Sequence, residues 1–232
     1  MARRPIFRPV LSGRPFVEEV VLDFDWYPGF AKSQAQKSIA SLHGAARERG
    51  LSPVLEISSK SDSALGVNLS AFNLTLRIRD RSMSVEVAFQ GSKVFEHGGP
   101  FHDLYGASSR EAKTDSRIRS SGQLIGFNIL GEEWPTEPQT CFYDWLYISA
   151  LSQHTDAARE LVKFNAFSDI AFNPEKSVNC QARSAAVFVA LSRQGLLAQA
   201  TRDKEVYMAL VRGKSGSGKR SLVQRDLFSD LG

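Results

Sequence analysis

Residues 84–95 read SVEVAFQGSKVF, a mostly apolar stretch that also contains one acid, one amide and one amine. On a helix with about 100° per residue, Glu86, Gln90 and Lys93 lie within roughly 60° of one another and form a narrow polar stripe. Ser84 is suited to cap this helix at its N-terminus. The pattern predicts a buried helix that lines a polar pocket. A partly exposed helix with a Glu–Lys pair is the alternative, and the alternation of residues 84–89 leaves a strand open.

The composition indicates a folded protein with a substantial core. Of the 232 residues, 42% are hydrophobic, which is enough for one large domain and argues against disorder. Cys141 and Cys180 lie far apart and the four histidines are scattered, so we expect a reduced interior and no metal site. No apolar run is long enough to span a membrane, and the basic N-terminus has no apolar segment of a secretory signal. We therefore expect a cytoplasmic protein.

Positive charge is concentrated at the two ends of the chain. Residues 1–14 contain four arginines and no acid, while residues 202–226 contain seven cations and three acids. The net charge of the whole chain is only +4, so the region between the ends is slightly acidic. Basic ends on a nearly neutral body suit an anionic partner such as a nucleic acid, and solvated tails are the alternative.

Periodicity and turn residues predict an α+β fold that is predominantly helical, a single domain with a small sheet built mostly from its first half. Strands are expected within 16–30, 54–59 and 72–79. Helices are expected over 33–50, 138–151, 156–164, 177–195 and 198–211, and 108–120 forms a polar helix at best. Residues 1–30 are expected to be an N-terminal extension packed on the main domain over 31–211, and 212–232 a basic flexible tail.

The tail sequence GKSGSGKRS partly matches a phosphate-binding P-loop. Arg220 stands where a serine or threonine would bind magnesium, and no strands follow to build the parallel sheet that such a loop requires. A flexible basic linker therefore explains the motif better than a nucleotide site.

The stretch SVEVAFQGSKVF resembles the signature of the NADAR superfamily, in which a Ser-Glu pair opens a helix and an aromatic-Gln step and a lysine follow. Residues 55–74 resemble that family's opening strand and Ser-Asn-Phe loop, which here reads Ser70-Ala71-Phe72, and residues 161–188 stand where the family closes its pocket. Val87 replaces the usual histidine, and the late acidic-Trp-Gly loop is not evident. The segments DFDWYPGFAKSQAQKSIASLH and FNPEKSVNCQARSA are similar to those of NADAR antitoxins paired with DarT-type DNA ADP-ribosyltransferase toxins.

The resemblance implies a NADAR (YbiA-like) glycosidase domain over 31–211 that cleaves N-glycosidic bonds to ribose. For the antitoxin group it implies an ADP-ribosyl glycohydrolase that removes ADP-ribose from guanine bases in DNA. The implied partners are ADP-ribosylated DNA or ADP-ribose and a cognate DarT-type toxin, and no metal or cofactor is required. The alternatives are a glycosidase for a small ribosylated metabolite of the riboflavin-pathway type and a non-catalytic antitoxin that binds toxin or DNA.

Three residues are candidates for catalysis. Cleavage of such a bond develops positive charge on the ribose. Glu86 would either stabilise this charge or act as a general acid or base. Lys93 would donate a proton or hold the substrate, or it would attack the anomeric carbon and form a Schiff base. Asp169 is a candidate second carboxylate.

Seven further residues are candidates for binding the substrate. Gln90 is expected to orient ribose hydroxyls, Arg183 to meet the pyrophosphate, and Trp134 to stack on a base. The alternative for polar residues in the loop before the last long helix is a cap or turn. The complete set is Ser70, Phe72, Gln90, Trp134, Asn173, Asn179 and Arg183.

Overall fold

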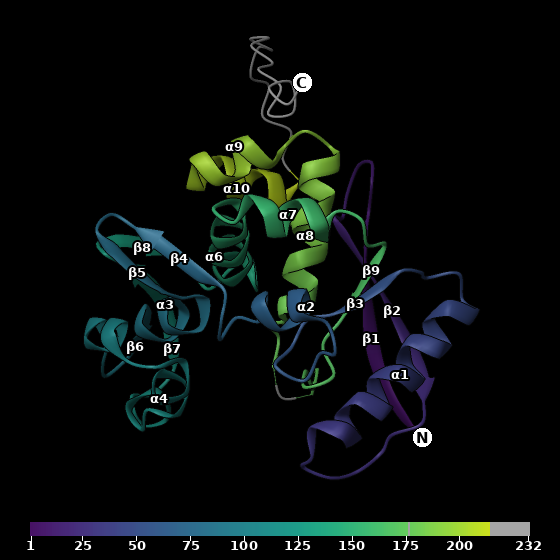
Figure 1. The fold of residues 1–232 in the computed structure, drawn as a ribbon. Coiled ribbons are helices and arrows are strands. Elements are labelled where there is room, and N and C mark those ends of the chain that lie inside the picture. The colour runs from purple at the N-terminus through teal and green to yellow at the C-terminus, as the bar shows by residue number, and fades with distance from the viewer. Residues whose placement is uncertain (176, 214–232) are drawn as a thin grey trace.

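The computed structural model describes residues 1–175 and 177–213 (Figure 1). The P-loop-like motif and the basic tail that the sequence predicts lie outside the described residues from position 214 onward. Within the described part, helices and strands are mixed, and the strands form three small sheets. The sequence predicted one small sheet in a predominantly helical domain, so strand content was underestimated.

A four-stranded sheet joins the N-terminus to the second half of the chain. Its order is β2 (Val17–Phe24), β1 (Ala2–Pro9), β9 (Ala166–Ser168) and β3 (Val54–Glu56). β1 pairs antiparallel with both β2 and β9, whereas β3 and β9 run parallel. Residues 1–30 therefore contribute two strands to the same sheet as β9.

Helix α1 (Lys32–Glu48) packs beside this sheet, as Figure 1 shows at its lower right. Ile39, Leu42 and Ala46 recur every three to four residues and are buried with Ile6 and Leu22 of the sheet. The helix ends before Gly50, which has the positive φ of 74° that glycine adopts at low cost. The helix predicted over 33–50 is confirmed.

Two further sheets lie on the opposite side of the molecule. The β4–β5 hairpin consists of Thr75–Ile78 and Arg81–Ser84, and the chain turns between them at Arg79 and Asp80. The third sheet has the order β6 (Lys93–Phe95), β7 (Leu124–Ile129) and β8 (Glu132–Trp134), and both pairings are antiparallel.

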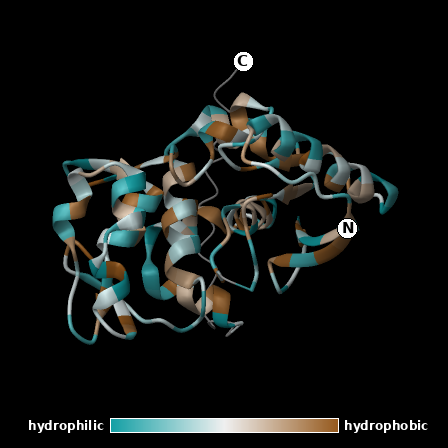
Figure 2. Cartoon of the chain, turned by 90° about the horizontal axis from the view of Figure 1, so that it is seen from below, coloured by the Kyte–Doolittle hydropathy of each residue, from teal (hydrophilic) through white to brown (hydrophobic). Residues whose placement is uncertain are grey.

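Two apolar helices, α6 (Cys141–Ser152) and α8 (Gln181–Arg193), pack against each other at the centre. Leu146, Tyr147 and Ile148 have no exposed surface, so α6 is buried on nearly all sides, as its sequence predicts. Figure 2 shows that other helices mix hydrophilic and hydrophobic residues, which suits helices with one exposed face. The remaining helices are α2 (Ala64–Asn68), α3 (Val85–Gly91), η1 (His102–Gly106), α4 (Ser109–Thr114), α5 (Arg117–Ser120), α7 (Thr155–Leu161), α9 (Leu197–Arg202) and α10 (Lys204–Arg212).

None of the helices in the described ranges is long and apolar enough to cross a membrane.

Candidate functional site

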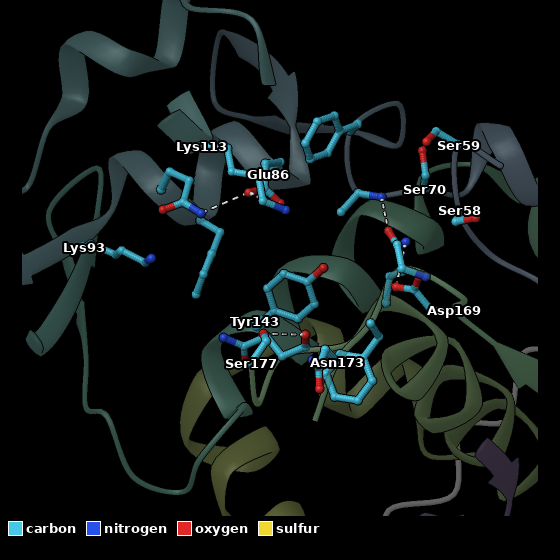
Figure 3. A pocket seen from close by; sticks show the side chains of 18 residues that line it. Ser58, Ser59, Ser70, Glu86, Lys93, Lys113, Tyr143, Asp169, Asn173 and Ser177 are labelled. Carbon is cyan, nitrogen blue, oxygen red and sulfur yellow. Dashed lines mark hydrogen bonds and ion pairs between the residues drawn. The ribbon is translucent and has the colours of Figure 1, made fainter. Parts of the chain in front are cut away.

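A cavity of about 480 Å³ opens between α3, α6 and the loops that follow β3 and β9 (Figure 3). Eight of the ten residues that the sequence singled out line it, although they come from three separate segments of the chain. They are Ser70, Phe72, Glu86, Gln90, Lys93, Asp169, Asn173 and Asn179. The residues expected to act together are thus brought to one hollow.

Helix α3 forms one wall of the cavity. The Ser84 hydroxyl accepts a hydrogen bond from the Val87 amide at 3.2 Å, so the predicted N-cap is present. Glu86 is only 5% exposed, and its Oε1 accepts a hydrogen bond from Gln90 Nε2 at 2.9 Å, one helical turn away. Both residues of this acid–amide pair belong to α3.

Lys93 reaches the cavity from a strand, not from the helix that the sequence predicted. α3 ends at Gly91, and Lys93 begins β6, where it pairs with Phe127 of β7. The turn at Ser92 is fixed from two sides, because its hydroxyl bonds the Ala88 carbonyl and its carbonyl accepts from the Asn128 amide. Residues 93–95 form backbone hydrogen bonds with β7 that a continued helix could not make. This tertiary pairing outweighs the helical pattern of the sequence.

The amine of Lys93 lies in an apolar setting. Its Nζ is 4.7 Å from the centre of the Phe89 ring, a cation–π contact. Burial lowers the pKa of Lys93 to about 8, and the positive charge of Lys113 adds to this lowering while Glu86 opposes it. About a tenth of the amine is therefore neutral at pH 7.

Asp169 faces the cavity from the loop after β9. Gln181 Nε2 donates to its Oδ2 at 3.0 Å, and the Ala171 amide donates to its Oδ1. Burial, and then the charge of the nearby Glu56 carboxylate, raise the pKa of Asp169 to about 7. Asp169 is thus a carboxyl group that holds a proton near neutral pH.

Glu56 is a buried acid that the sequence analysis did not identify. Its carboxylate accepts hydrogen bonds from the hydroxyls of Ser58 and Ser168 and from the amide of Ile170. Burial raises its pKa. Parallel pairing of β3 with β9 brings Glu56 opposite Ser168, which no local pattern indicates.

Two buried polar atoms of the cavity wall have no hydrogen-bond partner among the described residues. They are Ser70 Oγ and Gln90 Oε1, and their residues are 2% and 7% exposed. Buried polar groups are nearly always satisfied, so such atoms in a cavity wall point to a polar ligand. A hydroxyl and an amide oxygen suit the hydroxyl groups of a sugar.

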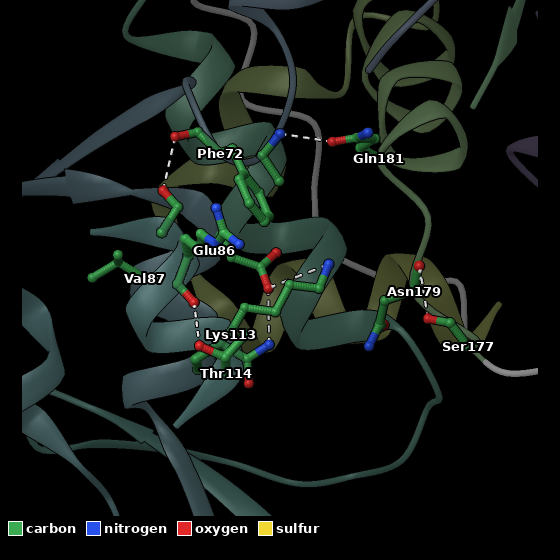
Figure 4. A network of polar contacts seen from close by, with 12 residues as sticks. Phe72, Glu86, Val87, Lys113, Thr114, Ser177, Asn179 and Gln181 are labelled. Atoms are coloured by element: carbon green, nitrogen blue, oxygen red, sulfur yellow. Dashed lines mark hydrogen bonds and ion pairs between the residues drawn. The ribbon is translucent and has the colours of Figure 1, made fainter. Parts of the chain in front are cut away.

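Gln181 and Lys113 were missed as site residues. Gln181 accepts from the Ala71 amide at 2.7 Å and donates to the Ile57 carbonyl, so it joins the loop at 70–72 to β3 (Figure 4). Lys113 lies on α4, with its Nζ 3.8 Å from Glu86 Oε1. Gln181 stands in the segment 161–188 that resembles the NADAR family, and this was the signal that the sequence offered for it.

Two expected substrate contacts lie away from the cavity. Trp134 is 2% exposed and packs on Phe142 and Trp145, so it belongs to the core. Arg183 forms an ion pair with Asp144 and donates to Thr140 at 2.9 Å. Trp134 is enclosed and Arg183 is engaged by Asp144, so the structure does not bring either residue to the cavity.

The described residues contain no group of three or more His, Cys, Asp and Glu side chains arranged to hold a metal ion. The charged side chains that line the cavity are instead two acids and two amines, Glu86, Asp169, Lys93 and Lys113.

Fold and site together define a mixed helix–strand protein whose polar cavity is lined by two acids and two lysines. Residues 2–221 match the family of DarT1-associated NADAR antitoxins. The chain belongs to this family, which confirms the family expected from its sequence and associates it with a DarT-type toxin. No curated protein matches the chain.

Proposed function

We propose that this antitoxin is an ADP-ribosyl glycohydrolase that removes ADP-ribose from guanine bases in DNA, and so reverses the modification made by a DarT-type toxin. One observation carries the proposal. Glu86 and Lys93 line the same cavity, together with two buried polar atoms that have no partner among the described residues. An acid, an amine and free sugar-binding groups are what cleavage of a ribosyl bond requires.

Glu86 is suited to stabilise the reacting sugar. Positive charge develops on the anomeric carbon and ring oxygen as the bond to the base breaks. A carboxylate in a site largely removed from water stabilises that charge more strongly than one in bulk solvent. The hydrogen bond from Gln90 holds the Glu86 carboxylate in position.

Lys93 is suited to attack the anomeric carbon. Its neutral nitrogen forms a bond to that carbon while the bond from carbon to the guanine nitrogen breaks, and the base takes up a proton as it leaves. Opening of the ribose ring then gives a Schiff base. Water hydrolyses this intermediate to free ADP-ribose and regenerates the amine. A lowered pKa favours this role, since only the neutral amine is nucleophilic.

Asp169 is suited to supply the proton to the departing base. It lines the cavity, and its raised pKa keeps it partly protonated near pH 7. The pKa of Tyr143, which is raised well above its usual value mainly by burial, also responds to the charges of both Glu86 and Asp169. Glu86, Asp169 and Tyr143 all line the same cavity (Figure 3).

The experiment is incubation of a guanine-ADP-ribosylated oligonucleotide with substoichiometric protein, with release of ADP-ribose as the readout. Glu86→Gln keeps the shape of the side chain and removes its charge, so turnover should fall on the order of 100-fold or more. Glu160→Gln is the matched control, because Glu160 is exposed, pairs with the nearby Lys163 and does not line the cavity among the described residues.

The outcomes separate this activity from its alternatives. Many ADP-ribose molecules released per protein support the glycohydrolase. Toxin neutralisation without any release would support a non-catalytic antitoxin instead. Cleavage of a small ribosylated metabolite, with the modified oligonucleotide left intact, would support a metabolite glycosidase.

A further inference from the structure

Lys113 differs from the other charged residues that line the cavity. Its side chain is 56% exposed, whereas Glu86 and Asp169 are buried and Lys93 is partly buried against Phe89. Lys113 therefore lies at the solvent edge of the cavity.

The backbone that carries Lys113 is firmly placed. α4 begins with a capping box formed by Ser108 and Glu111. The Ser109 hydroxyl donates to the Phe72 carbonyl at 2.8 Å and contacts the Ser84 hydroxyl at 2.7 Å. α4 is thus tied both to the loop at 70–72 and to the cap of α3, so the position of Lys113 relative to Glu86 is built into the fold.

The ammonium group itself is held loosely. Its Nζ is 3.8 Å from Glu86 Oε1, at the long end of an ion pair, and 5.0 Å from the centre of the Phe72 ring (Figure 4). A lysine ammonium has three donors, and the Lys113 side chain is 56% exposed although its partner Glu86 is buried. The amine is therefore able to turn to a phosphate oxygen while Gln90 still donates to the Glu86 carboxylate.

We propose that Lys113 binds the diphosphate of the ADP-ribosyl group and exchanges its contact with Glu86 for one with a phosphate oxygen. The identity of the ligand rests on the proposed function. If the anomeric carbon binds beside Glu86, the phosphate attached to the same ribose is only a few bonds away, and Lys113 is the exposed cation next to Glu86, with its Nζ 3.8 Å from Oε1. A flexible, hydrated ammonium is well suited to such a phosphate.

The exchange has a second consequence for Glu86. In the free protein Lys113 partly neutralises the carboxylate that the reaction needs. When a phosphate takes the ammonium, the full negative charge of Glu86 faces the sugar. Binding of the diphosphate to Lys113 would thus increase the negative charge that Glu86 presents to the sugar. A ribosylated compound without phosphates would not have this effect.

The test is calorimetric titration of ADP-ribose, and of adenosine as a probe without phosphates, into wild-type protein and Lys113→Met. Methionine keeps an apolar stem over Phe72 and removes the charge. Loss of one charge-assisted contact should weaken ADP-ribose binding about tenfold or more and leave adenosine binding unchanged. Lys113→Arg should stay within about threefold of wild type because it keeps the cation. Lys163→Met, an exposed lysine outside the cavity, is the matched control.

Two results would overturn the inference. One is wild-type affinity of Lys113→Met for ADP-ribose, and the other is an equal loss for ADP-ribose and adenosine, which would indicate a change of shape instead of a lost phosphate contact. The readout is binding, so it is independent of turnover. If the wild-type protein releases no ADP-ribose from modified DNA, the proposed function fails, while selective loss of ADP-ribose binding in Lys113→Met would still support the phosphate contact.

Discussion

The pH dependence of wild-type turnover distinguishes the two possible roles of Lys93. Burial beside Phe89 lowers the pKa of this amine from 10.5 to about 8. At pH 7 about 10% of such an amine is neutral, against about 0.03% for an ordinary lysine, a gain of about 300-fold in nucleophile. If Lys93 attacks the sugar while Asp169 protonates the base, the reaction needs a neutral amine and a protonated acid, so turnover should rise with pH, level off between about 7 and 8 and fall at higher pH. If Lys93 instead donates the proton, turnover should fall through a midpoint near 8 without the earlier rise.

The assay is the initial rate of ADP-ribose release between pH 6 and 10, with borohydride trapping at each pH. Trapping should give a covalent adduct that follows the same curve and is absent in Lys93→Ala and Lys93→Arg, since neither side chain forms a Schiff base. Substitution of the charged neighbours of Lys93 should shift the Lys93 midpoint in opposite directions. Lys113→Met removes a nearby positive charge and should move the midpoint upward, whereas Glu86→Gln should move it downward.

A folded Lys93→Ala protein with wild-type turnover would refute a catalytic Lys93. A midpoint that stays fixed in both Lys113→Met and Glu86→Gln would show that the titrating group is not Lys93. A wild-type rate that falls through pH 8 without any trapped adduct would refute attack by the amine and favour the proton donor.

Two further predictions concern stability. Asp169→Asn should lower turnover yet raise the melting temperature, and the gain should be larger at pH 8 than at pH 5. The folded-state pKa of Asp169 is raised to about 7, so the free-energy cost of burying this acid grows as the pH rises from its unfolded-state pKa toward 7. An equal gain at both pH values in thermal unfolding would contradict the buried acid pair with Glu56. Gly66→Ala should destabilise the fold by roughly 1–3 kcal/mol, because its Cβ would lie 2.0 Å from the Glu56 carbonyl oxygen and 2.5 Å from Ser61 Oγ. Gly44→Ala, which meets nothing within 4 Å in helix α1, should be neutral or stabilising by about 0.5–1 kcal/mol; denaturant unfolding that ranks the two glycines the other way would show that this packing is misjudged.

Part of the site follows from short-range sequence pattern. Ser84 caps α3, and Glu86 and Gln90, four residues apart, meet as a hydrogen-bonded pair. The apolar circumference of α6 indicates its central position, and burial of Leu146 and Ile148 confirms it. These features depend on spacing within a single helix, and the residues of that helix contain the necessary information.

Other parts of the site depend on contacts between distant segments. Lys93 looks helical by spacing but belongs to β6, because pairing with β7 some 30 residues later offers the backbone better partners. Trp134 looks like a platform for a base, yet it is enclosed by Phe142 and Trp145. The sequence does not indicate that Lys113 meets Glu86, because that contact depends on how α4 is tied to the loop at 70–72.

The sequence by itself indicated eight of the residues that line the cavity, and it identified the NADAR antitoxin family. The tertiary structure decided how those groups are tuned. The parallel pairing of β3 with β9 places Glu56 close to Asp169 and raises the pKa of that acid, and burial against Phe89 lowers that of Lys93. A pKa depends on burial and on charges a few ångströms away in space, and only the folded chain sets those distances.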